Sequence, residues 1–320
     1  MKKEINMNGN RGAYRRRNDK SRGILIGAIA VVLVAIAVVT FFIFAELFGW
    51  FEKNDSDPIG DMASDKFTST TIDVSSSDVH TGDLILVNDT YQYVAPSTAP
   101  VLVPIVSDRA SHGLSATNKP IYSYYTTTID NCVKLEKDSS KLFNQWADAF
   151  YKATGSIDLF VKDVSANDAS KTAEHQTGKA IDLCVWVSGS EYWNLDDAEY
   201  AETFKWLYDN AYKYGFVLRY PASKSTVTGV SNESYHFRQV GYAHAYYMSK
   251  NNLCLEEYLE LLKTSTSPLE FNGDDGNKYM VYYQAASEGD TTTLTVPADL
   301  DYTVSGDNMG GFIVTVTLDK

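Results

Sequence analysis

Cysteine is scarce in this chain of 320 residues, which contains only Cys132, Cys184 and Cys254. No two of them form a C-x-x-C pair, and this argues against a cysteine-ligated zinc site and against thioredoxin-like redox chemistry. An odd number of cysteines allows one disulfide and one free thiol, but the sequence leaves the pairing open. Cys184 lies in a strand-like apolar run, where we expect a packed, unreactive thiol.

Basic side chains are also few over most of the chain. The first 22 residues contain eight Lys and Arg against two Asp and Glu, which leaves 20 basic and 39 acidic residues in the remainder. This acidic remainder argues against nucleic-acid binding, and solubility is the simpler explanation of its charge. The sequence also shows no internal repeat and no glycine-rich phosphate loop.

One long hydrophobic run lies near the N-terminus, where residues 23–45 contain no charged side chain. A stretch of ~20 apolar residues is enough to cross a bilayer. The run exceeds the ~7–15 residues of a signal-peptide core, and its Phe-rich end offers no good cleavage site. We therefore expect an uncleaved transmembrane anchor over 23–46 rather than a cleaved signal peptide. The basic residues within 1–22 predict a cytoplasmic tail, so the rest of a single-pass chain lies outside the cell membrane.

Three regions are expected beyond the anchor. Residues 47–78 are rich in Asp, Ser, Thr and Gly and predict a flexible stalk. Residues 79–265 form the main domain, and 266–320 form a β-rich C-terminal extension. Apolar residues at helical spacing predict helices over 138–153, 198–214, 240–249 and 255–263, with Gly155 and Gly215 ending the first two. Alternating β-type residues predict strands over 279–283, 291–296 and 311–318.

The residue types of a catalytic zinc site occur in two short motifs. His175 is followed by Asp182, and Glu233 precedes His236 by three positions. Two imidazoles and one carboxylate form a three-ligand zinc set that leaves a fourth position open for water. A carboxylate that is not a ligand can take a proton from that water. Gly178 allows a bend after His175, before an extended segment that directs Asp182 toward the metal.

Three stretches carry a resemblance to a known family. They read AEHQTGKAID over 173–182, YGFVLRYP over 214–221 and ESYHFRQVG over 233–241. Together they resemble the VanY-like D-alanyl-D-alanine carboxypeptidases, zinc peptidases of the LAS type that act on bacterial cell walls. The resemblance covers roughly Gly82 to Leu262, and Leu84–Asn88 is similar to the strand that opens the family's catalytic domain.

The resemblance implies a role for each motif residue. His175, Asp182 and His236 are the zinc ligands, and Glu233 is the catalytic carboxylate. The other histidines, His80, His112 and His244, are expected to be structural, with His244 packing a helix.

The chain also departs from the family pattern. Ala173 replaces the usual Ser, and no arginine lies between Arg109 and Arg219, where the family has one that helps hold substrate oxygen. Loss of one such donor can cost ~10²–10³ in rate. Lys162 or Lys171 can replace it only as a point charge, without the bidentate geometry of arginine. Arg238 is a further candidate for substrate binding.

These observations predict an α+β fold in which a small antiparallel sheet carries the zinc site and helices pack against its other face. The expected protein is a membrane-anchored extracellular zinc carboxypeptidase, slow or altered in activity, that removes terminal D-Ala from peptidoglycan stem peptides. Its partners are then a stem peptide ending in D-Ala-D-Ala and, through the N-terminal helix, the lipid bilayer. Two alternatives remain: a peptidoglycan peptidase that cuts a different bond, and a wall-binding scaffold that has lost turnover.

Overall fold

A computed structural model describes residues 67–105, 134–163, 173–187 and 191–319 of the chain. The predicted tail over 1–22, the predicted anchor over 23–46 and most of the predicted stalk lie outside these residues, as do His112, Cys132 and Lys171. Among the residues that are described, no helix is both long and apolar enough to cross a membrane.

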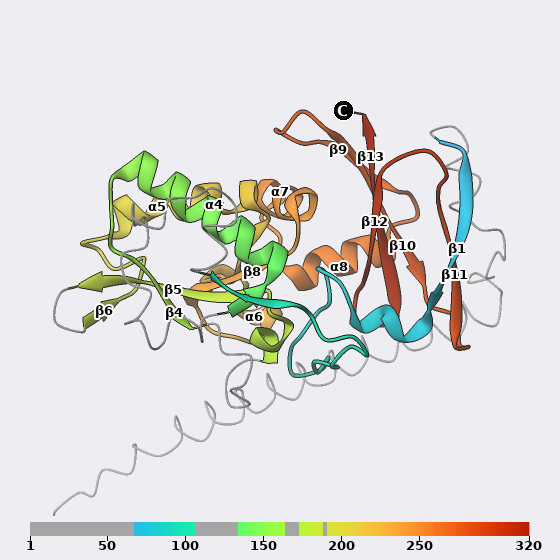
Figure 1. Ribbon diagram of the computed structural model, residues 1–320, viewed down its shortest axis with the longest axis horizontal. Coiled ribbons are helices and arrows are strands. Elements are labelled where there is room, and N and C mark those ends of the chain that lie inside the picture. The colour runs from blue at the N-terminus through green and yellow to red at the C-terminus, as the bar shows by residue number, and fades with distance from the viewer. Residues whose placement is uncertain (1–66, 106–133, 164–172, 188–190, 320) are drawn as a thin grey trace, which may run out of the picture. The chain divides into compact units, whose positions relative to one another are not determined.

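A five-stranded antiparallel sheet forms the centre of the main domain (Figure 1). Its strand order is β4-β5-β8-β7, with β6 pairing on β5. The strands are β4 (Leu159–Asp163), β5 (Ala180–Val187), β6 (Glu191–Trp193), β7 (Phe216–Tyr220) and β8 (Glu233–Gln239). This confirms the small antiparallel sheet that the sequence predicts.

Helices cover one face of this sheet. Helix α4 (Lys137–Thr154), helix α5 (Ala201–Asn210) and the 3-10 turn η3 (Ala211–Tyr214) pack on it through a shared apolar core. From the strands of the central sheet, this core takes residues that alternate along each strand, namely Leu159, Val161, Ile181, Leu183, Val185, Phe216 and Phe237. Their strand neighbours Asp182 and His236 therefore point to the opposite face.

Local sequence explains where these helices begin and end. The Glu136 carboxylate accepts hydrogen bonds from the backbone N–H groups of Asp138 and Ser139, which caps the start of α4. Gly155 ends α4 and Gly215 ends η3, each in the left-handed conformation that glycine adopts readily. The predicted helices over 138–153 and 198–214 are thus confirmed, and the second one ends in a 3-10 turn.

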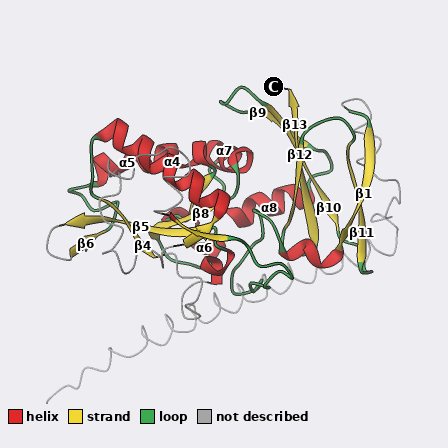
Figure 2. Ribbon diagram, in the orientation of Figure 1, coloured by secondary structure: helices red, strands yellow, loops and turns green. Residues whose placement is uncertain are grey.

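The C-terminal part of the chain is rich in strands (Figure 2). It follows helices α7 (Tyr242–Asn251) and α8 (Leu255–Thr264), which confirm the last two predicted helices. A four-stranded sheet of order β12-β13-β10-β9 and a two-stranded sheet of β1 (Ser69–Ser75) and β11 make up this region. The strands are β9 (Leu269–Asn272), β10 (Lys278–Ala285), β11 (Thr291–Pro297), β12 (Tyr302–Gly306) and β13 (Gly311–Asp319).

The remaining short elements are η1 (Ser76–His80), β2 (Leu102–Pro104), β3 (Lys134–Glu136), η2 (Ala173–Thr177), η4 (Ala222–Lys224) and α6 (Ser225–Thr228).

Two expectations differ from the structure. Part of the predicted stalk is ordered, because β1 (Ser69–Ser75) pairs with β11 and Ile72 and Val74 pack against the core behind it. Apolar and polar residues alternate there, and an average over the composition conceals that strand pattern. The segment 84–87 is buried but forms no strand.

The C-terminal sheet shares a core with the main domain. Val281 of β10 and Ile313 of β13 pack in one cluster with Leu84, Leu255 and Leu259. All of these residues belong to one compact unit, Pro58–Lys320. The extension is therefore integrated with the zinc-motif domain.

Candidate metal centre

Three residues meet on the face of the central sheet opposite the helices. Asp182 of β5 and His236 of β8 are direct register partners across the two strands. His175 comes from η2, and Gly178, with φ of 71°, turns the chain between η2 and β5. The potential ligand atoms of the three residues all lie within 4.8 Å of one another, and all three residues are buried.

This donor set fits a zinc ion. A tetrahedral zinc with bonds of about 2.1 Å holds neighbouring ligand atoms about 3.4 Å apart. The Nε2 atom of His175 lies 3.4 Å from Oδ1 of Asp182. The Nδ1 atom of His175 is buried without a hydrogen-bond partner in the described part of the chain, which is uncommon for a buried polar atom. A metal bound through Nε2 does not satisfy Nδ1, so the fit to zinc rests on the donor types and on the 3.4 Å separation.

Behind the cluster lies Glu174, a residue that the sequence motifs did not single out. Its Oε2 atom lies 2.9 Å from Nε2 of His236, and Nδ1 of the same ring lies 2.7 Å from Asp182 Oδ1. Arg219 and Arg238 donate to Oε1 of Glu174 at 2.9 and 3.1 Å. A carboxylate behind a ligating histidine fixes the tautomer and the orientation of the ring. Glu174 therefore holds His236 with Nδ1 directed toward the ligand cluster.

The electrostatics of this network favour charged carboxylates. Burial alone would raise the pKa of Glu174, but Arg219, His236 and Arg238 outweigh burial and hold that pKa well below its usual range. Burial likewise raises the pKa of Asp182, but hydrogen bonds from His175 and His236 lower it to about 2. Both groups are thus anionic at neutral pH, as metal binding requires.

His236 shows the opposite shift. Burial lowers the pKa of its imidazole, but the bonds to Asp182 and Glu174 raise it to about 9 when protein groups alone surround the ring. A proton on Nδ1 competes with a metal for the same lone pair. The two carboxylates therefore create a site that takes either a proton or a metal cation.

Glu233 occupies the first position of β8, and its side chain is half-buried. It has no hydrogen-bond partner among the described residues. Burial, together with the negative charges of Asp182 and Glu174, raises its pKa, although His236 and His175 act in the opposite sense. A carboxylate with a raised pKa near a metal-bound water is suited to general acid–base catalysis.

The structure does not support the prediction that Arg238 binds substrate. Its side chain is fully buried and donates to Glu174 and to the backbone carbonyls of Asp83, Ile85 and Gln239. Four of its five N–H groups thus donate inside the protein.

Of the two lysines, only Lys162 is described. It lies exposed on β4, with Nζ 4.2 Å from the ring centroid of Tyr235, and its role in substrate binding stays a prediction. Lys171 lies outside the described residues.

Tyr220 is a second site residue that the sequence motifs left without a role. It ends β7 opposite Glu233 of β8, and its ring centroid lies 5.1 Å from that of His236. Burial and the negative charge of Glu174 raise the pKa of its hydroxyl, so the hydroxyl stays protonated at neutral pH.

Two predictions about non-catalytic residues are confirmed. His244 of α7 is buried, and it contacts Tyr258 and Thr315 through hydrogen bonds of 2.8 and 3.0 Å. Cys184 is a buried free thiol whose pKa burial raises to about 12, so it is unreactive at neutral pH. Cys254 is also free and buried.

Comparison with known proteins identifies relatives of the region around this site. Residues 143–242 match the family model described as VanY, D-alanyl-D-alanine carboxypeptidase. A D-alanyl-D-alanine carboxypeptidase from Enterococcus faecium is 28% identical over 286 residues, which cover 83% of this chain and 86% of that protein. The putative carboxypeptidase YodJ from Bacillus subtilis (strain 168) is 44% identical over 93 residues, which cover 28% of this chain and 33% of that protein.

A solved structure shares the fold. The vancomycin-resistance D,D-dipeptidase VanXYg, in complex with a D-Ala-D-Ala phosphinate analogue, aligns with a TM-score of 0.61 at 23% identity. The alignment covers 78% of this chain and 99% of that one. The shared fold thus extends beyond the segment from Gly82 to Leu262 over which the motifs are recognised. The comparisons thus match residues 143–242 to the family that the motifs predict.

Proposed function

We propose that this VanY-like protein of the LAS type is a zinc carboxypeptidase that releases terminal D-alanine from peptidoglycan stem peptides ending in D-Ala-D-Ala. One observation supports the proposal most strongly. His175, Asp182 and His236 converge within 4.8 Å, and the half-buried Glu233 begins the strand that carries His236. This is the composition of a catalytic zinc site, with three protein ligands and a separate carboxylate. The relatives named D-alanyl-D-alanine carboxypeptidase support the choice of substrate.

Each residue has a chemical role in this proposal. His175, Asp182 and His236 hold the zinc ion, which when bound supplies a water of lowered pKa and a Lewis acid for the scissile carbonyl. Glu233 accepts the proton of the attacking water and returns it to the nitrogen of the leaving D-alanine. Glu174 keeps His236 oriented, and the buried Arg219 and Arg238 keep Glu174 charged.

The proposal also includes a location. The uncharged run over 23–45 and the basic residues before it support a single membrane anchor with a cytoplasmic N-terminus. The peptidase domain then lies outside the membrane, where peptidoglycan is found. Addition of protease to intact spheroplasts tests this: loss of a C-terminal epitope is expected, whereas protection of the epitope alongside a cleaved external control would contradict the orientation.

A direct assay tests the activity. The full-length chain is purified in detergent, loaded with zinc and incubated with a pentapeptide stem ending in D-Ala-D-Ala, and free D-alanine is measured by mass spectrometry. We expect one D-alanine released per peptide and loss of this release after chelation. Stems ending in D-Ala-D-lactate or in a single D-Ala test whether another bond is preferred. No release from any stem by a folded, zinc-loaded chain would support the scaffold alternative.

A further inference from the structure

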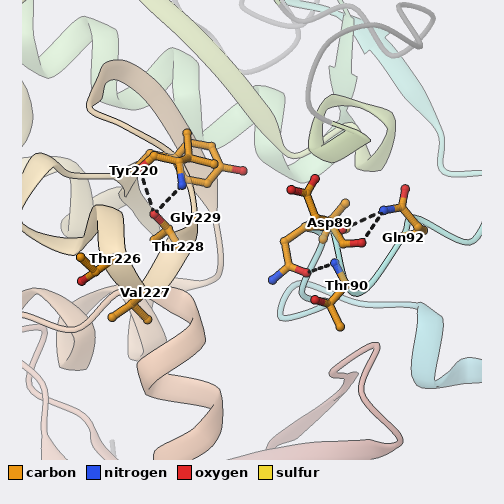
Figure 3. A pocket seen from close by; sticks show the side chains of 11 residues that line it. Asp89, Thr90, Gln92, Tyr220, Thr226, Val227, Thr228 and Gly229 are labelled. Atoms are coloured by element: carbon orange, nitrogen blue, oxygen red, sulfur yellow. Dashed lines mark hydrogen bonds between the residues drawn. The ribbon is translucent and has the colours of Figure 1, made fainter. Parts of the chain in front are cut away.

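A cavity of about 280 Å³ is lined in part by Tyr220 (Figure 3), the residue whose ring packs against His236. Two segments form its walls: residues 87–92, which precede the central sheet in the chain, and residues 226–230, between β7 and β8. Tyr220, at the end of β7, also lines it. The cavity is partly apolar on the second wall, where the Val227 side chain is 45% exposed.

Tyr220 connects this cavity to the metal centre. Its ring packs against His236 with a centroid separation of 5.1 Å, and it pairs with Glu233 across the strands. In Figure 3 its hydroxyl points toward the wall that carries Asp89. Because Tyr220 both lines the cavity and packs against His236, a substrate whose scissile bond lies at the metal centre runs next to the cavity.

The chemistry of the lining selects the kind of group that fits. Of the described residues around the cavity, Asp89 alone carries a charge, and its carboxylate has no hydrogen-bond partner among the described residues. The neighbouring Asn88 and Gln92 add polar side chains. A carboxylate ligand would meet like charge here, whereas an ammonium group would gain a charge-assisted hydrogen bond.

The wall that carries Asp89 is held in place from the C-terminal extension. The Asn308 side chain donates to the backbone carbonyls of Leu86 and Gln92 at 2.7 and 3.1 Å. The Leu86 N–H donates to the carbonyl of Asp307 at 3.0 Å. Within the wall, Asn88 Oδ1 accepts from the Thr90 N–H at 2.9 Å, which closes a tight turn. Asp89 is thus presented by a turn that is fixed at both ends.

We propose that this cavity is a substrate subsite in which Asp89 binds a primary ammonium group on the non-leaving side of the scissile bond. The inference rests on the proposed function, because a stem peptide carries a diamino acid immediately before its D-Ala-D-Ala end. The subsite makes Asp89 a specificity-determining residue, and the turn of the extension at Asp307 and Asn308 positions it.

Two matched substrates test this subsite. One is a pentapeptide stem with lysine at its third residue, and the other has norleucine there, which lacks only the amine. We expect kcat/KM of the full-length, zinc-loaded chain to favour the lysine peptide about fivefold, the scale of a partly exposed ion pair, and to lose this preference at high salt. Asp89→Asn should bring the ratio to about one, whereas Asp89→Glu should keep much of the preference.

The control is Asp299→Asn, which removes an exposed carboxylate elsewhere in the chain and should leave the ratio unchanged. Equal rates of the wild type on both peptides, or an unchanged ratio in Asp89→Asn, would overturn the subsite while leaving the proposed function intact. Absence of turnover on both peptides would reject the proposed function instead. In that case calorimetric binding of the two peptides to the wild type still decides the subsite: about fivefold tighter binding of the lysine peptide supports it, and equal binding rejects it.

Discussion

Two buried histidines in this protein are set to opposite charge states by their surroundings. His236, at the metal centre, is 1% exposed, and His244, at the junction with the C-terminal sheet, is 6% exposed. The pKa of His236 is raised to about 9, whereas that of His244 is lowered to about 4. Burial disfavours the charged imidazole in both places, so the difference comes from the partners.

The partners differ in charge. His236 lies between the carboxylates of Asp182 and Glu174, which outweigh the cost of burial. His244 lies between two neutral hydroxyls, those of Tyr258 and Thr315, and the charge of Asp83 only partly opposes burial. The first environment suits a cation, and the second suits a neutral structural link between α7, α8 and β13. Burial of a histidine is therefore a weak sign of function, whereas burial between anions is a strong one.

The largest expected effect is a difference in zinc content between variants of the two histidines. His236→Ala should lower the zinc content of the purified chain from about one ion to nearly none, because a three-ligand site has no spare ligand. His244→Ala is the matched control and should retain zinc even where it lowers stability. Elemental analysis of both variants, with His175→Ala beside them, measures this. Full zinc content in His236→Ala and His175→Ala would reject the ligand set.

Glu174→Gln tests the anion behind His236. The substitution leaves the buried Arg219 and Arg238 without their shared carboxylate, which typically costs about 3–5 kcal/mol in stability. It should also weaken zinc binding about 10- to 100-fold, the usual cost of losing a group behind a ligating histidine. Chelator competition gives the affinity and thermal unfolding gives the stability. The control is Glu256→Gln, which removes another partner of Arg219 and should leave the zinc affinity unchanged. Equal losses of zinc affinity in the two variants would contradict a specific role for Glu174.

The lowered pKa of His244 predicts that the free energy of unfolding depends on pH. Its folded pKa of about 4 lies below the ordinary value of 6.5, so between these values the unfolded chain binds a proton that the folded chain does not. Its contribution to stability is complete above pH 6.5 and falls as the pH decreases toward 4, by about 3 kcal/mol in total. The difference in unfolding free energy between the wild type and His244→Asn should shrink over this range. A difference that is constant with pH would show that folding leaves the pKa of His244 unchanged.

The smallest expected effect concerns the link from the extension to residues 86–92. Asn308 has φ of 62°, so Asn308→Gly keeps the backbone and removes only the side-chain hydrogen bonds. One of these bonds joins Asn308 Oδ1 to His80 Nδ1, and the other two, to the carbonyls of Leu86 and Gln92, contribute about 1–2 kcal/mol. Hydrogen exchange at residues 86–92 should therefore accelerate about tenfold, since local opening sets the exchange rate, while exchange in β5 and β8 stays unchanged. Equal acceleration in the central sheet would mean that Asn308 stabilises the whole unit.

The sequence predicts the parts of this structure that local rules determine. Glycines at 155 and 215 end helices, and alternation places Asp182 on the face opposite Leu183. The motifs contain the three residues that the structure brings together, His175, Asp182 and His236. Glu174 was missed because its role depends on Arg219 and Arg238, which reach it from other strands. Its position directly before His175 was the only available signal. The link from Asn308 to Leu86 spans 222 residues, and such long-range contacts leave no periodic pattern in a single sequence.

The variant Glu233→Gln tests the central claim most directly, because it removes the proposed proton acceptor and none of the ligands. Zinc content and D-alanine release are measured on the same preparation of wild type and variant. We predict about one zinc per chain in both, with release by the variant reduced ~10²–10⁴-fold, the usual contribution of a general base. Loss of zinc from the variant, or release at the rate of the wild type, would contradict the assignment of Glu233 as the catalytic carboxylate of this site.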